Sequence, residues 1–256
     1  MSFVGNINHA NALVAGASGG IGLEFVKQLL QDGNLAQIYA TYRCRESAEE
    51  LIAIAKDYPN RLICLPMDVT EEGQIADVAA KMHLAIDKLH LTINCIGFLH
   101  EGEIRPEKGL RQVESESLLR YFQVNSIGGV LLAKHLLPLF RHDERSVFAS
   151  ISAKIGSIGD NDLGGWYGYR ASKAALNMLM RTISIEYERK SPQTIVVTLH
   201  PGTTDTRLSQ PFQRHVPAEQ LFPPERTVAQ LLGIIQNLEV RDSGQFFNWD
   251  GSRLPW

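Results

Sequence analysis

The 256-residue sequence has few cysteines, no long apolar run and little net charge, and each absence excludes a class of protein. Its three cysteines, Cys44, Cys64 and Cys95, are odd in number and widely spaced, so neither a disulfide framework nor a zinc site is expected. No apolar stretch reaches the ~18 residues that a membrane span requires. No basic segment followed by a long apolar one opens the chain, so we expect no signal peptide and a reducing, cytoplasmic location.

The charge balance argues against a nucleic-acid partner. The formal net charge is -3 at pH 7, from 25 Lys and Arg against 28 Asp and Glu. This leaves no strongly basic character of the kind that nucleic-acid binding requires. The eight histidines are scattered without an HExxH motif, so no metal site is predicted. What is present is 44% hydrophobic residues in a chain long enough to bury a sizeable core.

Short apolar runs alternate with helical patterns along the chain. Seven runs are apolar on both faces, as in a buried parallel sheet. The predicted strands are Ala12–Ala15, Gln37–Tyr42, Arg61–Leu65, Leu89–Asn94, Ser146–Ser150, Ile195–His200 and Gln245–Asn248. The predicted helices are Ile21–Gln31, Ala48–Lys56, Glu72–Ala85, Leu118–Asn125, Gly129–Phe140, Ala171–Arg189 and Thr227–Leu238. The pattern predicts an α/β protein, with residues 1–256 forming a single-domain Rossmann fold. Its doubly wound parallel sheet has about seven strands and carries helices on both faces.

Two longer irregular stretches follow predicted strands, at Gly97–Val113 and Pro201–Pro224. In an open α/β sheet, the loops at the carboxyl ends of the strands border the ligand crevice. We therefore expect the proline-rich second stretch, residues 201–224, to act as a substrate lid.

The stretch ALVAGASGGIGLEFVKQLL places Gly16, Gly20 and Gly22 on a strand-to-helix turn. Such glycines permit a tight turn and let the backbone approach a pyrophosphate, while a helix starting near Ile21 offers it free N–H groups. A plain strand–helix turn would show the same spacing. The small Ser18 between the glycines favours the cofactor site.

The end of the second predicted strand decides between NAD(H) and NADP(H). In IYATYRCRES no acid that could bind a ribose 2′-OH occurs until Glu46, and Arg43 and Arg45 come before it. A guanidinium at this place can pair with a 2′-phosphate, which favours NADP(H). Two solvated surface arginines would give the same pattern.

The segment GWYGYRASKAALNML carries Tyr169 and Lys173, an i, i+4 pair on one helix face. The ammonium group can stabilise a phenolate and lower a tyrosine pKa that is ordinarily about 10. Such a tyrosine can deliver a proton to a carbonyl oxygen. By itself the Y-x-x-x-K spacing is common and often marks surface residues. The polar motifs LPMDVT, INCIG, SVFASISAKIGSIG and TLHPGTTDTRL lie at successive strand ends and point to one shared crevice.

In this order, and over nearly the whole chain, these motifs resemble those of the short-chain dehydrogenase/reductase family. GASGGIG is similar to the family's glycine motif, MDV (Asp68 and Val69) to its adenine-contacting Asp-Val, and NCIG (Asn94–Gly97) to its Asn-Asn-Ala-Gly. YFQVNSIGG offers Asn125 as the catalytic asparagine, and YRASK resembles the tyrosine–lysine motif. HPGTTDT resembles the motif that closes over nicotinamide, with Thr204 in place of the usual Val. PEKGLRQV, SAKIGSIGDNDLGGWYGYRASKAALNML and NWDGSRLPW resemble the C-factor and sniffer-like branch of carbonyl reductases.

The resemblance implies an NADPH-dependent oxidoreductase that reduces a small ketone or aldehyde to an alcohol. Tyr169 would donate the proton, and Lys173 would lower its pKa and bind the nicotinamide ribose. Asn125 would help hold a water that links Lys173 to solvent. Ser152, at the end of the fifth strand, would polarise the carbonyl, with Ser150 and Ser157 as alternatives. The residues implied to bind the cofactor are Gly16, Ser18, Gly20, Ile21, Gly22, Arg43, Asp68, Val69, Asn94, Gly97, Tyr169, Lys173, Pro201, Gly202, Thr204 and Thr206.

The family resemblance also implies a homodimer or homotetramer, formed through Gly129–Phe140 and Ala171–Arg189, with no nucleic-acid or membrane partner. One alternative is a non-catalytic, NADP(H)-binding, C-factor-like signalling protein, although a pure sensor needs no proton relay. A second is a sugar-nucleotide epimerase or dehydratase, which shares the glycine loop and Y-x-x-x-K. Only about 55 residues follow Pro201, which leaves little room for the larger C-terminal substrate domain of those enzymes.

Overall fold

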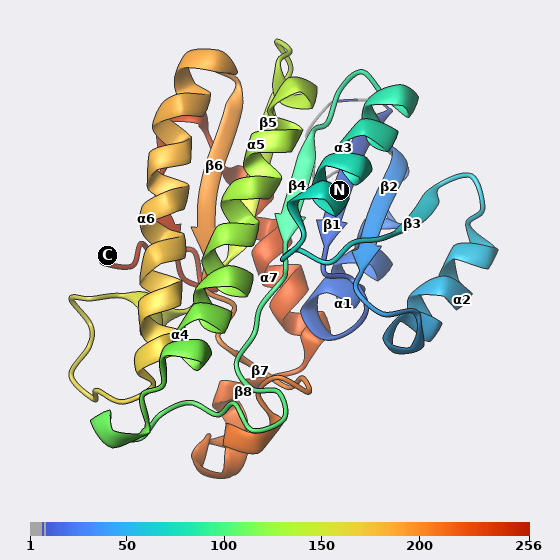
Figure 1. The fold of residues 1–256 in the computed structure, drawn as a ribbon. Helices are drawn as coiled ribbons and strands as arrows, with labels where there is room; N and C mark the ends of the chain where they lie inside the picture. The colour runs from blue at the N-terminus through green and yellow to red at the C-terminus, as the bar shows by residue number, and fades with distance from the viewer. Residues whose placement is uncertain (1–6, 8) are drawn as a thin grey trace.

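Seven parallel strands form one sheet in the order β3-β2-β1-β4-β5-β6-β9 (Figure 1). This computed structural model describes residue 7 and residues 9–256. The strands are β1 (Ala10–Ala15), β2 (Leu35–Tyr42), β3 (Leu62–Pro66), β4 (Leu91–Asn94), β5 (Ser146–Ile151), β6 (Thr194–Leu199) and β9 (Phe246–Phe247). The helices are α1 (Gly20–Leu29), α2 (Glu49–Asp57), α3 (Glu72–Ala85), α4 (Ser115–Phe122), α5 (Gly128–Phe140), α6 (Tyr167–Lys190) and α7 (Pro224–Asn237). The predicted fold class is confirmed.

Alternate residues of each strand enter two separate cores. On β1, Ala12 and Val14 pack with apolar residues of α1, α2 and α7. Leu13 and Ala15 pack instead with residues of α3, α4, α5 and α6. Neighbours in a strand point to opposite faces, so a sheet covered on both sides needs strands that are apolar throughout. Figure 1 shows α3, α5 and α6 in front of the sheet and α1 and α7 behind it.

The strand order reverses between β1 and β4. From β1 the chain winds outward to β2 and β3, and from β4 it winds the other way to β5 and β6. At such a reversal the two crossovers lie on opposite faces of the sheet, and a crevice opens beyond the carboxyl ends of the two strands. The glycine loop leaves β1 at this point and the Asn94–Gly97 motif leaves β4, so the fold brings both motifs to one place.

Three details differ from the sequence predictions. The predicted helix Leu118–Asn125 ends at Phe122, and a π-helical turn, Gln123–Ile127, joins it to α5. The longest helix, α6, begins at Tyr167 rather than Ala171. The stretch 201–224, predicted to be irregular, contains a small parallel pair, β7 (Thr203–Thr204) and β8 (Leu221–Phe222), and short 3-10 turns.

Candidate functional site

Three loops gather beyond the carboxyl ends of the strands. They follow β4, β5 and β6 and cover residues 95–114, 152–166 and 200–223, and Figure 1 shows all three at the lower end of the sheet. Ring contacts and hydrogen bonds join them. His100 of the first loop packs on Phe212 of the third, with ring centroids 5.7 Å apart. Trp166 of the second packs on the same ring at 4.9 Å. The region predicted to be a lid therefore contacts both other loops.

The glycine loop has the backbone conformation that an anion cradle requires. Gly16 and Gly20 adopt φ values of +79° and +53°, which side-chain-bearing residues rarely take. A Cβ on Gly22 would lie 2.2 Å from the Gly16 carbonyl oxygen, so only glycine lets helix α1 start this close to the strand exit. No side chain caps the first turn of α1, which leaves its N–H groups and positive dipole end available to a phosphate. Ser18 and Ile21 are half-buried beside this turn.

Arg43 lies just beyond the end of β2 and faces the loop that follows β4. Its guanidinium pairs with Glu101 at 2.7 Å, and both side chains are half exposed. Burial alone would raise the pKa of Asp68, but hydrogen bonds from Thr70 and the positive charges of Arg43 and Arg120 lower it. Val69 lies against helix α5, where a Cβ on Gly128 would be 2.3 Å from its side chain. Two arginines and two carboxylates therefore border the predicted adenine end of the crevice.

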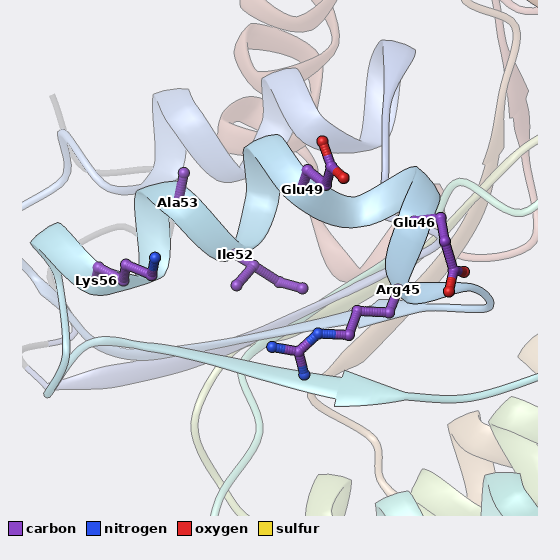
Figure 2. Close-up of a pocket in the computed structure, with 6 residues that line it drawn as sticks. All are labelled: Arg45, Glu46, Glu49, Ile52, Ala53 and Lys56. Atoms are coloured by element: carbon purple, nitrogen blue, oxygen red, sulfur yellow. The ribbon is translucent and has the colours of Figure 1, made fainter.

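Arg45 lies apart from these groups, in an open pocket on helix α2 (Figure 2). The pocket is lined by Arg45, Glu46, Glu49, Ile52, Ala53 and Lys56. Figure 2 shows Arg45 extending on the side of Ile52, away from the Glu46 carboxylate. Two cations and two carboxylates line this pocket, which lies on α2. Arg43 pairs with Glu101 of the loop after β4, whereas Arg45 lines the pocket on α2.

The chain leaving β4 runs directly past Lys173. A Cβ on Gly97 would lie 3.8 Å from Lys173 Nζ. Asn94 is buried, donates to Ser150 Oγ at 3.3 Å and accepts from the backbone N–H of Ile96 at 3.2 Å. Asn94 thus shapes the turn at the strand exit, and Gly97 keeps the space beside the lysine open.

Tyr169 and Lys173 lie on the crevice end of α6, where burial sets both pKa values. Lys173 Nζ donates to the Ile151 carbonyl at 3.0 Å and lies 5.9 Å from the centre of the Tyr169 ring. Burial lowers the pKa of Lys173 to about 8, opposed by the nearby Cys95 thiol. Burial raises the pKa of the Tyr169 phenol, the opposite of the predicted direction. Burial is the cause of this shift, and it keeps the phenol in the protonated form that a proton donor needs.

Asn125 occupies the π-helical turn and connects two walls of the crevice. Its side chain accepts from the backbone N–H of Phe98 at 2.7 Å and donates to the carbonyl of Phe98 at 2.9 Å. It also donates to Ser172 Oγ at 3.0 Å, on the helix that carries Tyr169 and Lys173. The asparagine therefore fixes the loop after β4 against α6.

Of the three candidate serines, only Ser152 is hydrogen-bonded to α6. Ser152 Oγ donates to Asn177 Oδ1 at 2.6 Å. Ser157 Oγ accepts from the backbone N–H of Asp160 at 3.2 Å, as a turn serine does. Ser150 lies within β5 and is bonded by Asn94. The bond fixes Ser152 to α6, the helix that also carries Tyr169, and the assignment of the catalytic serine stays a prediction.

The Pro201–Thr206 motif reaches across to the glycine loop. A Cβ on Gly20 would lie 3.1 Å from the methyl group of Thr206. Thr204 is buried, and its hydroxyl bonds to Thr227 of α7 at 2.9 Å. Gly202 has a φ of +72° and lies against the rings of Phe222 and Trp249. Thr206 therefore faces the glycine loop, whereas Thr204 anchors the motif to α7.

The sequence patterns did not single out two residues of this region, Asn177 and Glu107. Asn177 follows Lys173 by four residues and Tyr169 by eight, so helical spacing places it on the same face of α6 and could have found it. Glu107 comes from the irregular loop after β4, where no periodicity applies, and is 2% exposed. Within the described part of the chain, no group of three or more His, Cys, Asp or Glu side chains could hold a metal. In that same part, no helix has the length and apolar character to cross a membrane.

The chain is similar to known proteins in both sequence and fold. The family profile for short chain dehydrogenases matches residues 10–217. The NADPH-bound carbonyl reductase from chicken fatty liver is 29% identical, with 99% of this chain and 96% of that chain covered and a TM-score of 0.87. The carbonyl reductase Sniffer of Drosophila melanogaster is 26% identical, with 97% and 100% covered and a TM-score of 0.84. The C-signal of Myxococcus xanthus is 31% identical over 147 residues, which cover 57% of this chain and 83% of that protein.

Proposed function

Because the chain belongs to the short-chain dehydrogenase/reductase family, we propose that this oxidoreductase uses NADPH to reduce the carbonyl group of a small ketone or aldehyde. The observation that carries the proposal is that Lys173 lies beside both the buried Tyr169 and Gly97, in the segment whose Ile96 lies against Gly16 of the glycine loop. Two structures similar to this chain are carbonyl reductases, one of them with NADPH bound.

The residues present fit a bound dinucleotide phosphate. The backbone of Gly16–Gly22 and the uncapped first turn of α1 would hold the pyrophosphate. Arg43, now paired with a carboxylate, would hold the 2′-phosphate. Asp68 and Val69 would border the adenine, and Thr206 would close over the glycine loop. When bound, NADPH supplies the hydride that the carbonyl carbon receives.

The protein's own groups bind the substrate and move one proton. Ser152 would turn its hydroxyl from Asn177 to the carbonyl oxygen and polarise it, and Tyr169 would give that oxygen the phenolic proton. Lys173, charged below a pKa of about 8, would stabilise the phenolate that forms. The side chain of Asn125 already bonds to Phe98 and Ser172. A water that links Lys173 to solvent would therefore bind to the backbone of the π-helical turn rather than to this side chain. Residues 201–224 would act as the substrate lid, and association through α5 and α6 stays a prediction.

The proposed function predicts NADPH oxidation when the protein is supplied with carbonyl compounds. We expect a loss of NADPH absorbance at 340 nm with at least one member of a panel of aliphatic and aromatic ketones and aldehydes, and formation of the matching alcohol by chromatography. The similarity to C-signal motivates the alternative, a non-catalytic NADP(H)-binding protein. Tight NADPH binding with no turnover across the panel would favour that alternative.

The cofactor preference predicts a specific defect in Arg43→Ala. A charge-assisted hydrogen bond to the 2′-phosphate contributes about 2 kcal/mol, so the Kd for NADPH should rise roughly thirtyfold. The Kd for NADH should stay within about threefold, because NADH has no such phosphate. Fluorescence titration measures both constants. Arg45→Ala is the matched control and should change neither, since Arg45 lies in the mixed-charge pocket on α2. An equal rise for both cofactors in Arg43→Ala would contradict the assignment.

A further inference from the structure

Three consecutive residues before α6 adopt left-handed backbone conformations. Gly164, Gly165 and Trp166 have φ values of 63°, 65° and 52°. Glycine enters this region freely, but a bulky residue such as tryptophan does so only where the surrounding structure holds it. Such strain concentrates at functional sites. The conformation turns the chain into α6 three residues before Tyr169.

The group that holds Trp166 is the buried Glu107. Its carbonyl accepts from the backbone N–H of Trp166 at 2.5 Å, and its carboxylate accepts from the N–H of Gly168 at 3.2 Å. Among the described residues, the second carboxylate oxygen has no hydrogen-bond partner although it is buried. Burying a carboxylate is costly, and the N-terminal end of a long helix is a place where its charge is favoured. Glu107 therefore fixes both the strained residue and the first turn of α6.

The indole of Trp166 lies between the tyrosine and the lid. Its ring centre is 6.1 Å from that of Tyr169 and 4.9 Å from that of Phe212, and both pairs meet edge to face at 70° and 62°. Trp166 and Phe212 are half-buried, so each keeps ring surface available. The proposed mechanism uses none of Glu107, Trp166 and Phe212. Trp166 and Phe212 form an aromatic wall, and Trp166 lies beside the ring of Tyr169.

We propose that Glu107 and Trp166 determine substrate specificity: Glu107 positions Trp166, and the indole with Phe212 forms the binding surface for a flat aromatic substituent on the substrate. The proposal rests on the proposed function in taking Tyr169 as the place where the carbonyl oxygen binds. Offset and edge-to-face ring contacts favour an aromatic ring over a saturated ring of the same size.

Binding of two ketones of the same carbon skeleton tests the wall without relying on turnover. Acetophenone and cyclohexyl methyl ketone are titrated by calorimetry into NADP+-loaded protein. We expect acetophenone to bind roughly fivefold to tenfold more tightly than its saturated counterpart. Trp166→Leu should remove this preference, and Trp166→Phe should retain most of it. Glu107→Ala keeps the main-chain bond to Trp166 but removes the carboxylate bond that holds Gly168 at the start of α6, so it should weaken the preference. Glu107→Gln, which keeps an acceptor for Gly168, should retain it.

Trp256→Leu is the control for loss of an indole, because Trp256 packs on Phe246 away from this wall. It should leave the preference as in the unaltered protein. An unaltered protein that binds the two ketones equally, or neither, overturns the proposal, as does a Trp166→Leu protein with the preference intact. Thermal melts exclude unfolding as the cause of a loss. If the protein binds acetophenone more tightly than its saturated counterpart but reduces no carbonyl compound, the aromatic wall is supported and the proposed function is wrong.

Discussion

Replacing Tyr169 by Phe is expected to lower kcat for carbonyl reduction by about 10³ while the Kd for NADPH changes less than about threefold. Phe lacks only the hydroxyl group, so the ring contacts with Tyr121 and Trp166 remain. The proton for the developing alkoxide is then missing, whereas the glycine loop is untouched. Steady-state kinetics and fluorescence titration with NADPH measure the two quantities separately.

Tyr121→Phe is the matched control for this result. Tyr121 is fully buried and packs on Tyr169, with ring centroids 6.3 Å apart. Its hydroxyl donates to the Leu99 carbonyl at 2.7 Å, which is a structural bond. The control should lose about 1 kcal/mol of stability and keep kcat within about threefold. If Tyr169→Phe keeps full turnover, or Tyr121→Phe loses as much, the phenol of Tyr169 is not the proton donor.

Lys173→Met is expected to abolish turnover and to make the cofactor-free protein more stable. The lysine pKa falls from 10.5 to about 8 on folding because the ammonium is buried. At pH 7 this burial costs about 3 kcal/mol. The substitution also removes the 3.0 Å hydrogen bond to the Ile151 carbonyl. This loss lowers the gain in stability by about 1 kcal/mol. A net increase of about 2 kcal/mol in the free energy of unfolding should result at pH 7, with kcat reduced at least about hundredfold.

The pH dependence of this gain follows from the two pKa values. Below about 8 the lysine is charged in both the folded and the unfolded chain, so the cost of burial is fully present. Between 8 and 10.5 the unfolded chain binds more protons than the folded one, and the stability of the unaltered protein rises with pH. Urea unfolding at pH 7 and pH 10 should show the advantage of Lys173→Met shrinking.

Lys190→Met is the surface control on the same helix, where the lysine pairs with Glu186 and is half exposed. It should change the stability by less than about 1 kcal/mol. A Lys173→Met protein that is less stable at pH 7, or whose advantage does not change with pH, would show that the buried ammonium carries no such cost.

The sequence was sufficient for the fold and for the strand exits at which the motifs lie. Strands apolar on both faces could belong only to a covered parallel sheet, and the order of the motifs placed each at a strand exit. The predicted family and its C-factor and sniffer-like branch are confirmed by the family profile and by the similarity to C-signal and Sniffer.

What could not be predicted depends on tertiary contacts. The π-helical turn at Asn125 shifts the helical pattern by one residue, which periodicity over a short helix does not resolve. The direction of the Tyr169 shift was wrong because spacing shows the neighbouring lysine but not how dry the site is. The Arg43–Glu101 pair and the Glu107–Gly168 bond join residues 58 and 61 positions apart, and no local pattern encodes such partners.

The contact between Gly22 and Gly16 has a consequence for redesign. A single methyl group on Gly22 would lie 2.2 Å from the Gly16 carbonyl oxygen and collide with it. The turn that would face the phosphates is therefore formed by main-chain atoms, which side-chain substitutions cannot change. A change in dinucleotide preference must therefore come from the exposed positions that follow β2. A library centred on Arg43 would therefore test cofactor choice while leaving the packing of the first crossover intact.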